Sequence, residues 1–347
     1  MQTAHSLKPG IEPALELIER VMRDGRPLAE ECPLVFREEF DGRVLQFADE
    51  ERVHAALAIL PRTLVTARGP VRIALIGGVS TDPASRERGL ATQLLAAAEN
   101  AAADMGCMAT LLWSDDPTFY VRRGYRTIGT EVDIALPKDL IGLLPEIEAR
   151  AYRPEDAAAL HALYEQHPVR CERTPEEMEA LLECPDMELV VAEVEGQVVA
   201  YAARGRGEDL THYIHEWAGS AEGVLGLMRH LAESWYQTAP NCENDLMTLS
   251  PDQPLEVTQR LCDLGFPSAR GFLGIAKLID SSAARDLLAS AAGQDGKALA
   301  TLTSRELLEC LFPPKSESQT ALEASRWLGC EPESLPCFGF TWGLDSI

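Results

Sequence analysis

The sequence predicts an α/β (α+β) fold, with two mixed-sheet domains in tandem and a small C-terminal segment. One observation is the order of strand, turn and helix between residues 71 and 106, followed by another apolar strand. A second is that this order of elements returns between residues 188 and 249. We therefore expect one domain at residues 1–140, another at residues 148–280 and the segment at residues 281–347.

The first domain is expected to open with a helix and a hairpin. Residues 11–24 place apolar side chains at helical spacing after an early proline, which predicts an amphipathic helix. Two strand candidates follow at residues 43–48 and 54–60. The polar connection Asp49-Glu50-Glu51 between them is short enough for a hairpin.

The next strand, residues 71–79, is expected to lead into a binding site. It ends in Gly77-Gly78, which is typical of a strand that is bulged or opened so that a ligand can approach its backbone. After a turn, apolar residues at helical spacing predict a helix from residue 90 to Gly106. The other elements expected in this domain are a strand at residues 109–113, a short helix at residues 117–122 and a strand region at residues 126–136.

The second domain is expected to repeat these elements after a short strand and a helix at residues 148–166. Its Gly265-Phe266 pair matches Gly124-Tyr125 of the first domain. Leu261 stands where the first domain has Tyr120, so the second copy keeps the fold pattern and lacks the hydroxyl. The remaining expected elements are a hairpin at residues 188–205, a strand at residues 211–217, a helix at residues 222–236 and a strand at residues 243–249.

The C-terminal segment begins with an Ala- and Ser-rich stretch at residues 281–305 that predicts a helix. Near the end of the chain, Phe338, Phe340 and Trp342 fall on one side of an extended tail. We expect this tail to dock on the protein.

The charge of the chain bears on its partners. Thirty-one Lys and Arg residues face 55 Asp and Glu residues, a formal charge of −24, which argues against a nucleic-acid partner because phosphates would be repelled. An acidic surface favours a cationic amine instead. The charge is explained equally well by solubility alone, and both interpretations stay open.

Several features point to a cytoplasmic protein without a membrane span or a metal. No apolar stretch approaches the roughly 20 residues that a bilayer requires, and residues 1–10 lack the features of a signal peptide. The nine cysteines are odd in number and contain no Cys-x-x-Cys pair, which indicates reduced thiols. His212 and His215 have an odd spacing on a predicted strand, so their imidazoles would point to opposite faces.

The strongest functional signal is the loop Val79-Ser-Thr-Asp-Pro-Ala-Ser-Arg-Glu-Arg-Gly-Leu-Ala-Thr92, between the predicted strand and helix. Gly89 and the small Ala91 would let phosphates approach the backbone N–H groups of the first helical turn, and Arg86 and Arg88 could add charge-assisted contacts. The alternative is a solvated loop with a chance glycine. The loop resembles the Arg-x-x-Gly-x-Gly/Ala motif of GNAT acetyltransferases, and this resemblance implies that acetyl-CoA binds to Arg86, Glu87, Arg88, Gly89, Leu90, Ala91 and Thr92.

The second signal is Phe119-Tyr120-Val-Arg-Arg-Gly124-Tyr125, which is similar to the Phe-Tyr-x-x-x-Gly-Phe/Tyr segment of the same family. A phenol within hydrogen-bond distance can protonate a departing thiolate, which is general acid catalysis. The resemblance assigns this role to Tyr120, with coenzyme A as the leaving group. The alternative is a tyrosine that only packs in the core.

The resemblance also implies roles for residues on either side of the predicted cofactor site. In GNAT proteins the strand before the phosphate loop splays from its neighbour and its backbone contacts the pantetheine arm and the thioester carbonyl; here that strand carries Val79 and Thr81. Ser114 follows the next strand, where relatives often carry a polar residue that faces the cofactor. Capping of the helix at Pro117 explains Ser114 equally well.

Two GNAT units in tandem, the second degenerate, are similar to the enhanced-intracellular-survival (Eis) type of acetyltransferase. The terminal carboxylate reaches the active site in that type, which would make Ile347 the general base; the alternative is an inert docked terminus. Residues 281–347 would correspond to a truncated form of the sterol-carrier-like third domain, at about half the expected length.

Together these features predict direct acetyl transfer from acetyl-CoA to a primary amine in a ternary complex. The acceptor would be a small-molecule or peptide amine, and the second domain would shape the acceptor pocket or form a homo-oligomer contact. The alternative is a non-catalytic acyl-CoA-binding or regulatory module.

Overall fold

The structure is a computed structural model that describes residues 4–7, 10–66, 69–239, 242, 244–292, 299–312, 326 and 340–347. It divides into two compact units. The first comprises residues 1–129, 273–339 and Ile347, and the second comprises residues 130–272 and 340–346. No helix within the described part of the chain is both long enough and apolar enough to cross a membrane.

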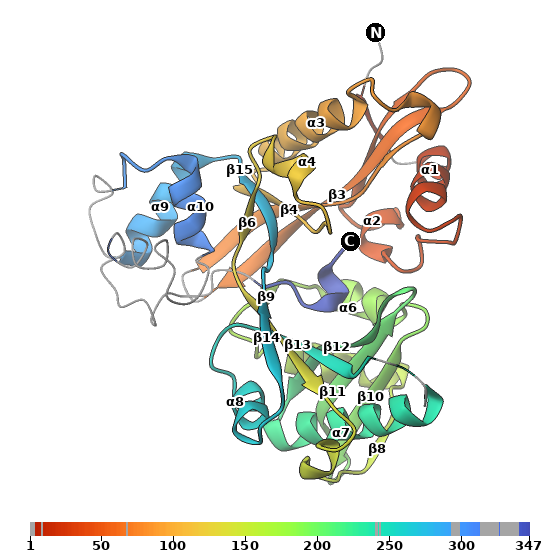
Figure 1. The fold of residues 1–347 in the computed structure, drawn as a ribbon, viewed down its shortest axis with the longest axis vertical. Helices are drawn as coiled ribbons and strands as arrows, with labels where there is room; N and C mark the ends of the chain where they lie inside the picture. Colours follow the sequence, from red (N-terminus) through yellow and green to blue (C-terminus); the bar gives the residue numbers. More distant parts are fainter. Residues whose placement is uncertain are drawn as a thin grey trace. The chain divides into compact units, whose positions relative to one another are not determined.

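The first unit is built on a mixed sheet with the strand order β1-β2-β3-β4-β5-β15-β6 (Figure 1). Strands β4 and β5 run parallel, and the other neighbouring pairs run antiparallel. The predicted hairpin of β2 and β3 is confirmed. The bounds of the strands are β1 (Ala4–Leu7), β2 (Arg43–Ala48), β3 (Val53–Thr66), β4 (Gly69–Thr81), β5 (Ala109–Leu112), β6 (Arg126–Ile128) and β15 (Gly274–Leu278).

The helices of the first unit include those expected at residues 11–24 and 90–106. Leu90, Leu94 and Ala98 of helix α3 pack into the apolar core with side chains of β3 and β4, because their helical spacing places them on one face. The single helix predicted over residues 281–305 is wrong, since α9 ends at Ala292 and Thr303 caps a new helix. The bounds are α1 (Glu12–Met22), α2 (Pro33–Phe36), η1 (Pro83–Ser85), α3 (Leu90–Asp104), α4 (Thr118–Val121), α9 (Ser281–Ala292) and α10 (Ser304–Leu311).

The second unit is built on another mixed sheet, with the strand order β14-β7-β13-β12-β11-β10-β8. Strands β12 and β13 are parallel and are joined through helix α7, as β4 and β5 are through α3. The hairpin predicted at residues 188–205 is confirmed. The bounds are β7 (Glu131–Leu136), η2 (Ile141–Leu143), β8 (Ala149–Ala151), η3 (Pro154–Asp156), α5 (Ala157–Tyr164), β9 (Arg170–Cys171), α6 (Pro175–Leu182), β10 (Glu188–Val194), β11 (Gln197–Arg206), β12 (Asp209–Gly219), α7 (Ala221–Thr238), β13 (Leu246–Pro251), α8 (Glu256–Asp263), β14 (Ser268–Gly271) and η5 (Gly343–Asp345).

The two sheets exchange one strand each. Strand β7 directly follows β6 in sequence but lies between β13 and β14, whereas β15 follows β14 and lies between β5 and β6. The strand region predicted at residues 126–136 is therefore split, and the compact units do not follow the predicted boundaries at residues 1–140 and 148–280. The physical reason is that a strand pairs with the edge that covers its backbone and apolar side chains, whichever part of the sequence provides that edge.

The tail at residues 340–346 is docked, as predicted. The Trp342 indole is fully buried, stacks on His167 at 4.2 Å between ring centroids and donates a hydrogen bond to the Val169 carbonyl. Asp345 forms a buried ion pair with Arg173, which also pairs with Glu216. A buried carboxylate needs such a partner, so this pairing fixes the tail within the second unit. Phe338 lies outside the described residues.

Candidate functional site

Strand β4 ends its pairing with β5 and shifts its register with β3 close to Gly77 and Gly78. Its pairing with β5 runs only from Ile73 to Leu75 among the described residues. On its other side the register with β3 shifts between Ala56 and Ala58, and Gly78 adopts a φ of +59° that most residues avoid. Beyond Leu75, β4 therefore has no strand pairing with β5 among the described residues, which agrees with the bulged or opened strand that the glycine pair predicts.

The loop after β4 ends at a helix terminus that no side chain caps. Gly89 is the N-cap of α3 with φ of 74°, and the first helical N–H to bond within the helix is that of Gln93, to the Gly89 carbonyl at 3.2 Å. The preceding N–H groups of the first turn make this terminus electropositive. Glu87 also has a positive φ of 64°, a strained conformation that is often found at binding sites.

The second unit lacks this loop. Strand β12 ends at Gly219 and α7 begins at Ala221, so one residue joins strand to helix. That residue, Ser220, caps α7 by accepting a hydrogen bond from the Gly223 N–H. An anion would have to displace the cap, so only the first unit keeps this helix terminus free of a side-chain cap.

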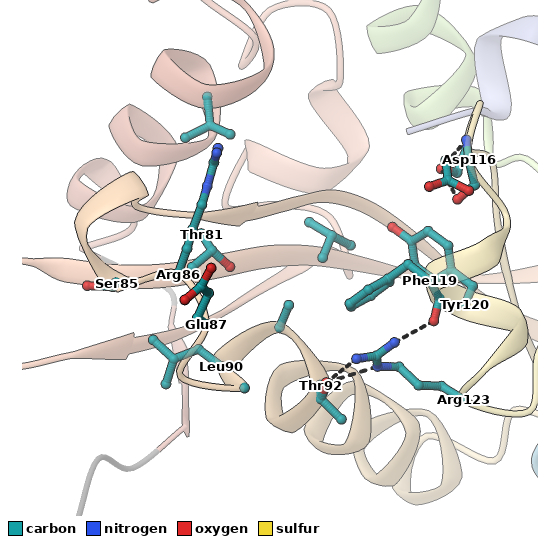
Figure 2. Close-up of a pocket in the computed structure, with 15 residues that line it drawn as sticks. Thr81, Ser85, Arg86, Glu87, Leu90, Thr92, Asp116, Phe119, Tyr120 and Arg123 are labelled. Carbon is teal, nitrogen blue, oxygen red and sulfur yellow. Dashed lines mark hydrogen bonds between the residues drawn. The ribbon is translucent and has the colours of Figure 1, made fainter.

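A cavity of about 640 Å³ lies between the loop, the start of α3 and α4. Figure 2 shows Arg86 and Glu87 on the loop and Tyr120 and Arg123 on the opposite wall. All residues predicted to bind the cofactor line this cavity except Arg88, whose side chain is exposed. The lining comprises Val21, Val79, Thr81, Ser85, Arg86, Glu87, Gly89, Leu90, Ala91, Thr92, Ser114, Asp116, Phe119, Tyr120 and Arg123.

Arg123 is the main lining residue that sequence reasoning missed. Its guanidinium donates from Nε at 2.9 Å and from Nη2 at 2.6 Å to the Thr92 hydroxyl, and it lies 3.6 Å above the centre of the Phe119 ring. These contacts hold a positive charge beside the start of α3 (Figure 2). The available signal was its place in the quoted aromatic segment, three residues after Tyr120, in the turn that follows α4.

Ser114 lines the cavity and also shapes a local turn. Its hydroxyl donates to the Asp116 carbonyl at 3.2 Å and accepts from the Asp116 N–H at 3.3 Å. At the start of α4, the Thr118 N–H donates to the Asp116 carboxylate at 2.9 Å, and hydrogen bonds with Thr118 lower the pKa of Asp116. Asp116, rather than Ser114, thus provides the acceptor at this helix start.

Tyr120 is half-buried and held mainly through its backbone. Its N–H donates to the Pro117 carbonyl and its ring packs edge-on against Phe119 and Tyr125. No described residue bonds to its hydroxyl. Burial raises the pKa of Tyr120, although the Arg123 charge acts in the opposite direction. The phenol therefore keeps its proton at neutral pH and can donate it.

A second cavity of about 360 Å³ shares Val79, Ser114, Asp116 and Tyr120 with the first. It extends along β4 past Gly77, where an added Cβ would come within 2.7 Å of the backbone carbonyl carbon of Ile347. The predicted base Ile347 therefore lies beside this cavity. The other lining residues are Met22, Ile76, Gly78, Leu112, Trp113 and Asp115.

The described residues contain no cluster of three or more His, Cys, Asp or Glu side chains that could hold a metal ion. His215 is buried and bonds the Gly205 carbonyl, and the His212 ring packs against Tyr213. These two histidines are thus engaged separately within the second unit.

Part of this chain matches a family model, and its fold is similar to that of several solved structures. Residues 8–128 match the family model of the acetyltransferase (GNAT) domain. A conserved protein from Enterococcus faecalis aligns with a TM-score of 0.62 at 12% identity, covering 80% of this chain and 73% of that one. A GCN5-related N-acetyltransferase from Kribbella flavida aligns with a TM-score of 0.57 at 16% identity, covering 82% and 73%.

Eis1 from Mycobacterium abscessus is also similar in fold, with a TM-score of 0.51 at 18% identity, and the alignment covers 83% of this chain and 76% of that one. No curated protein matches the sequence. At these identities the structural likeness concerns the fold alone. The family match spans β4, the loop and α3, so the part of this chain that forms the candidate site is similar to the GNAT acetyltransferase domain.

Proposed function

We propose that this protein is an acetyl-CoA-dependent N-acetyltransferase that transfers acetyl directly to a primary amine. The observation that carries the proposal is the meeting of two cavities at Val79 and Tyr120. One cavity begins at an uncapped helix terminus suited to a diphosphate, and the other offers room for an acceptor. A group-transfer enzyme needs both substrates to meet beside its acid.

The residues of the loop fit the anionic part of acetyl-CoA. The first-turn N–H groups of α3 and the Arg86 and Arg123 charges would bind the diphosphate, and Gly89 has no side chain to block its approach. The β4 backbone near Val79 and Thr81, beyond the pairing with β5, would hold the pantetheine arm and polarise the thioester carbonyl. Bound acetyl-CoA supplies the acetyl group as a thioester.

In the proposed reaction the amine nitrogen forms a bond to the acetyl carbon while the carbon–sulfur bond breaks. Tyr120 donates its hydroxyl proton to the departing sulfur, because a protonated thiol leaves more readily than a thiolate. The amine gives its proton to the Ile347 carboxylate. The products are the acetylated amine and coenzyme A.

The second cavity suits a cationic acceptor with an apolar part. Its lining includes the acidic residues Asp115 and Asp116 and the largely apolar residues Met22 and Trp113. Opposite charge would raise the local concentration of an ammonium group, in keeping with the formal charge of −24. Small-molecule polyamines and peptide amines both have this character.

A Gly77→Ala substitution tests the role of Ile347. The new methyl group would lie within 2.7 Å of the Ile347 backbone, so the carboxylate must shift. We expect kcat to fall by about 10- to 100-fold, because a displacement near 1 Å can cost that much in catalysis. Gly142→Ala is the control, since its Cβ would meet no atom within 4 Å. Unchanged turnover in Gly77→Ala would remove Ile347 as the base.

The proposed function is tested by titrating the purified protein with acetyl-CoA in a calorimeter and then measuring thiol release with a panel of amines. The panel contains an aminoglycoside-like polyamine, a lysine peptide and a peptide with a free N-terminus. Binding followed by amine-dependent thiol release is the expected result. Binding without release from any amine would favour a non-catalytic acyl-CoA-binding module, and no binding would overturn the proposal.

A further inference from the structure

A hydrogen-bonded chain of three side chains stands behind the phosphate loop, and the catalytic proposal does not use it. His54 of β3 is buried, with only 3% of its surface exposed. Its Nδ1 lies 2.8 Å from the Ser85 hydroxyl oxygen, and its Nε2 lies 2.6 Å from a carboxylate oxygen of Asp49. All three residues belong to the first unit.

The far end of this chain is anchored in the β2–β3 turn. The other carboxylate oxygen of Asp49 accepts hydrogen bonds from the N–H groups of Glu51 at 3.0 Å and Arg52 at 3.1 Å. The hydrogen bond from His54, followed by those two, lowers the pKa of Asp49 to about 2. Asp49 is therefore a charged acceptor at neutral pH, and it fixes the orientation of the imidazole.

The near end of the chain holds the residue directly before the phosphate loop. Ser85 is the last residue of η1, is fully buried and precedes Arg86. The same histidine also holds the start of this turn, because the Asp82 N–H donates to the His54 carbonyl at 2.9 Å. His54 thus forms hydrogen bonds with both ends of the segment from Asp82 to Ser85. Its backbone carbonyl bonds Asp82, and its side chain bonds Ser85.

A Ser-His-Asp row can also activate a serine as a nucleophile. That role requires the hydroxyl to face the substrate. Figure 2 shows the Ser85 hydroxyl turned away from the other labelled residues of the cavity, and the residue has no exposed surface. The geometry therefore favours a positioning role.

We propose that Asp49, His54 and Ser85 position the backbone from Arg86 to Gly89 for the diphosphate of the acyl donor. This inference rests on the proposed function. It makes the three side chains positioning residues for donor affinity, with no part in the transfer step. Substitution of these residues should therefore change the KM only for donors that carry the diphosphate.

Two substitutions of His54 test its two side-chain hydrogen bonds separately. In His54→Gln the side-chain amide takes the place of Nε2, so the hydrogen bond to Asp49 is retained and the hydrogen bond to Ser85 is lost. In His54→Asn the side-chain amide takes the place of Nδ1, so the hydrogen bond to Ser85 is retained and the hydrogen bond to Asp49 is lost. Ser85→Ala removes the near link directly. Each variant is assayed with acetyl-CoA and with acetyl-pantetheine, which has the thioester and lacks the diphosphate, and KM and kcat are compared with those of the unmodified protein.

We expect His54→Gln and Ser85→Ala to raise the KM for acetyl-CoA by about tenfold, with kcat unchanged, because each loses one buried hydrogen bond at the loop. His54→Asn should have a smaller effect. With acetyl-pantetheine all three variants should match the unmodified protein. His161→Gln is the control for replacing a partly buried histidine, since the His161 ring bonds the Arg173 carbonyl within the second unit, away from the loop of the first.

Equal losses with both donors, or a fall in kcat, would overturn the positioning role, as would an unchanged KM for acetyl-CoA in every variant. Failure of the proposed function has a different signature. In that case the unmodified protein itself would neither bind coenzyme A in a calorimeter nor consume either donor.

Discussion

A Tyr120→Phe variant is expected to lose about 10²- to 10⁴-fold in kcat while keeping its affinity for acetyl-CoA, because general acid catalysis contributes that much. The fold should be unaffected, since no described residue bonds to the hydroxyl and the ring contacts with Phe119 and Tyr125 remain. Thiol release under saturating acetyl-CoA measures the change. A loss of less than about twofold would reduce Tyr120 to a packing residue.

The matched control is Tyr125→Phe, five residues along the same segment. The Tyr125 hydroxyl accepts a hydrogen bond from Thr110 at 3.3 Å and is fully buried, so its removal should cost about 1 kcal/mol of stability. Turnover should stay within twofold of the unmodified protein. Equal losses of kcat in the two variants would indicate damage to the core they share.

The pH profile adds an independent check on the same assignment. A general acid acts in its protonated form, so its contribution is present below its pKa and disappears as the pH rises through that pKa. Burial raises the pKa of Tyr120 above the ordinary value of 10. Activity that depends on Tyr120 should therefore persist to about pH 10. An alkaline fall centred near pH 8 that is absent from Tyr120→Phe would contradict the raised pKa of Tyr120.

A Gly89→Asp variant is expected to weaken acetyl-CoA binding by about 100-fold or more, because it places a carboxylate where the diphosphate is proposed to bind. The matched comparison is Gly89→Asn, which has the same shape without the charge. Both side chains tolerate the left-handed conformation at φ of 74°, and both are good helix N-caps, so helix α3 should form in each.

Calorimetric titration with acetyl-CoA separates the two effects. The loss in Gly89→Asn reports the cost of the added side chain, including its capping of the first helical turn, and the additional loss in Gly89→Asp reports repulsion between like charges. This additional loss should shrink at high ionic strength, since salt screens exposed charges. If Asp and Asn weakened binding equally at low salt, the diphosphate would not bind at this helix terminus.

Much of the fold and of the candidate site could be predicted from local sequence patterns. Helix α3 follows from apolar residues at helical spacing, and the opening of β4 follows from Gly77-Gly78, because both depend on neighbouring residues alone. The loop from Arg86 to Thr92 was identified as a cofactor candidate for the same reason. Its residues other than Arg88 line one cavity because a strand end, a turn and a helix start are close in space whenever they are close in sequence.

Other features depend on partners that are distant in the chain. Which sheet receives β7 and which receives β15 is decided by the free edges that folding presents, so no local pattern marked the exchange. The placement of Arg123 against Thr92, of His54 against Ser85 and of Ile347 beside Gly77 likewise joins residues separated by 31 to 270 positions. The sequence by itself thus determined the elements and the phosphate loop, whose formation is local. Tertiary structure alone decided which side chains meet around them, because those contacts arise only when the packed sheets bring remote segments together.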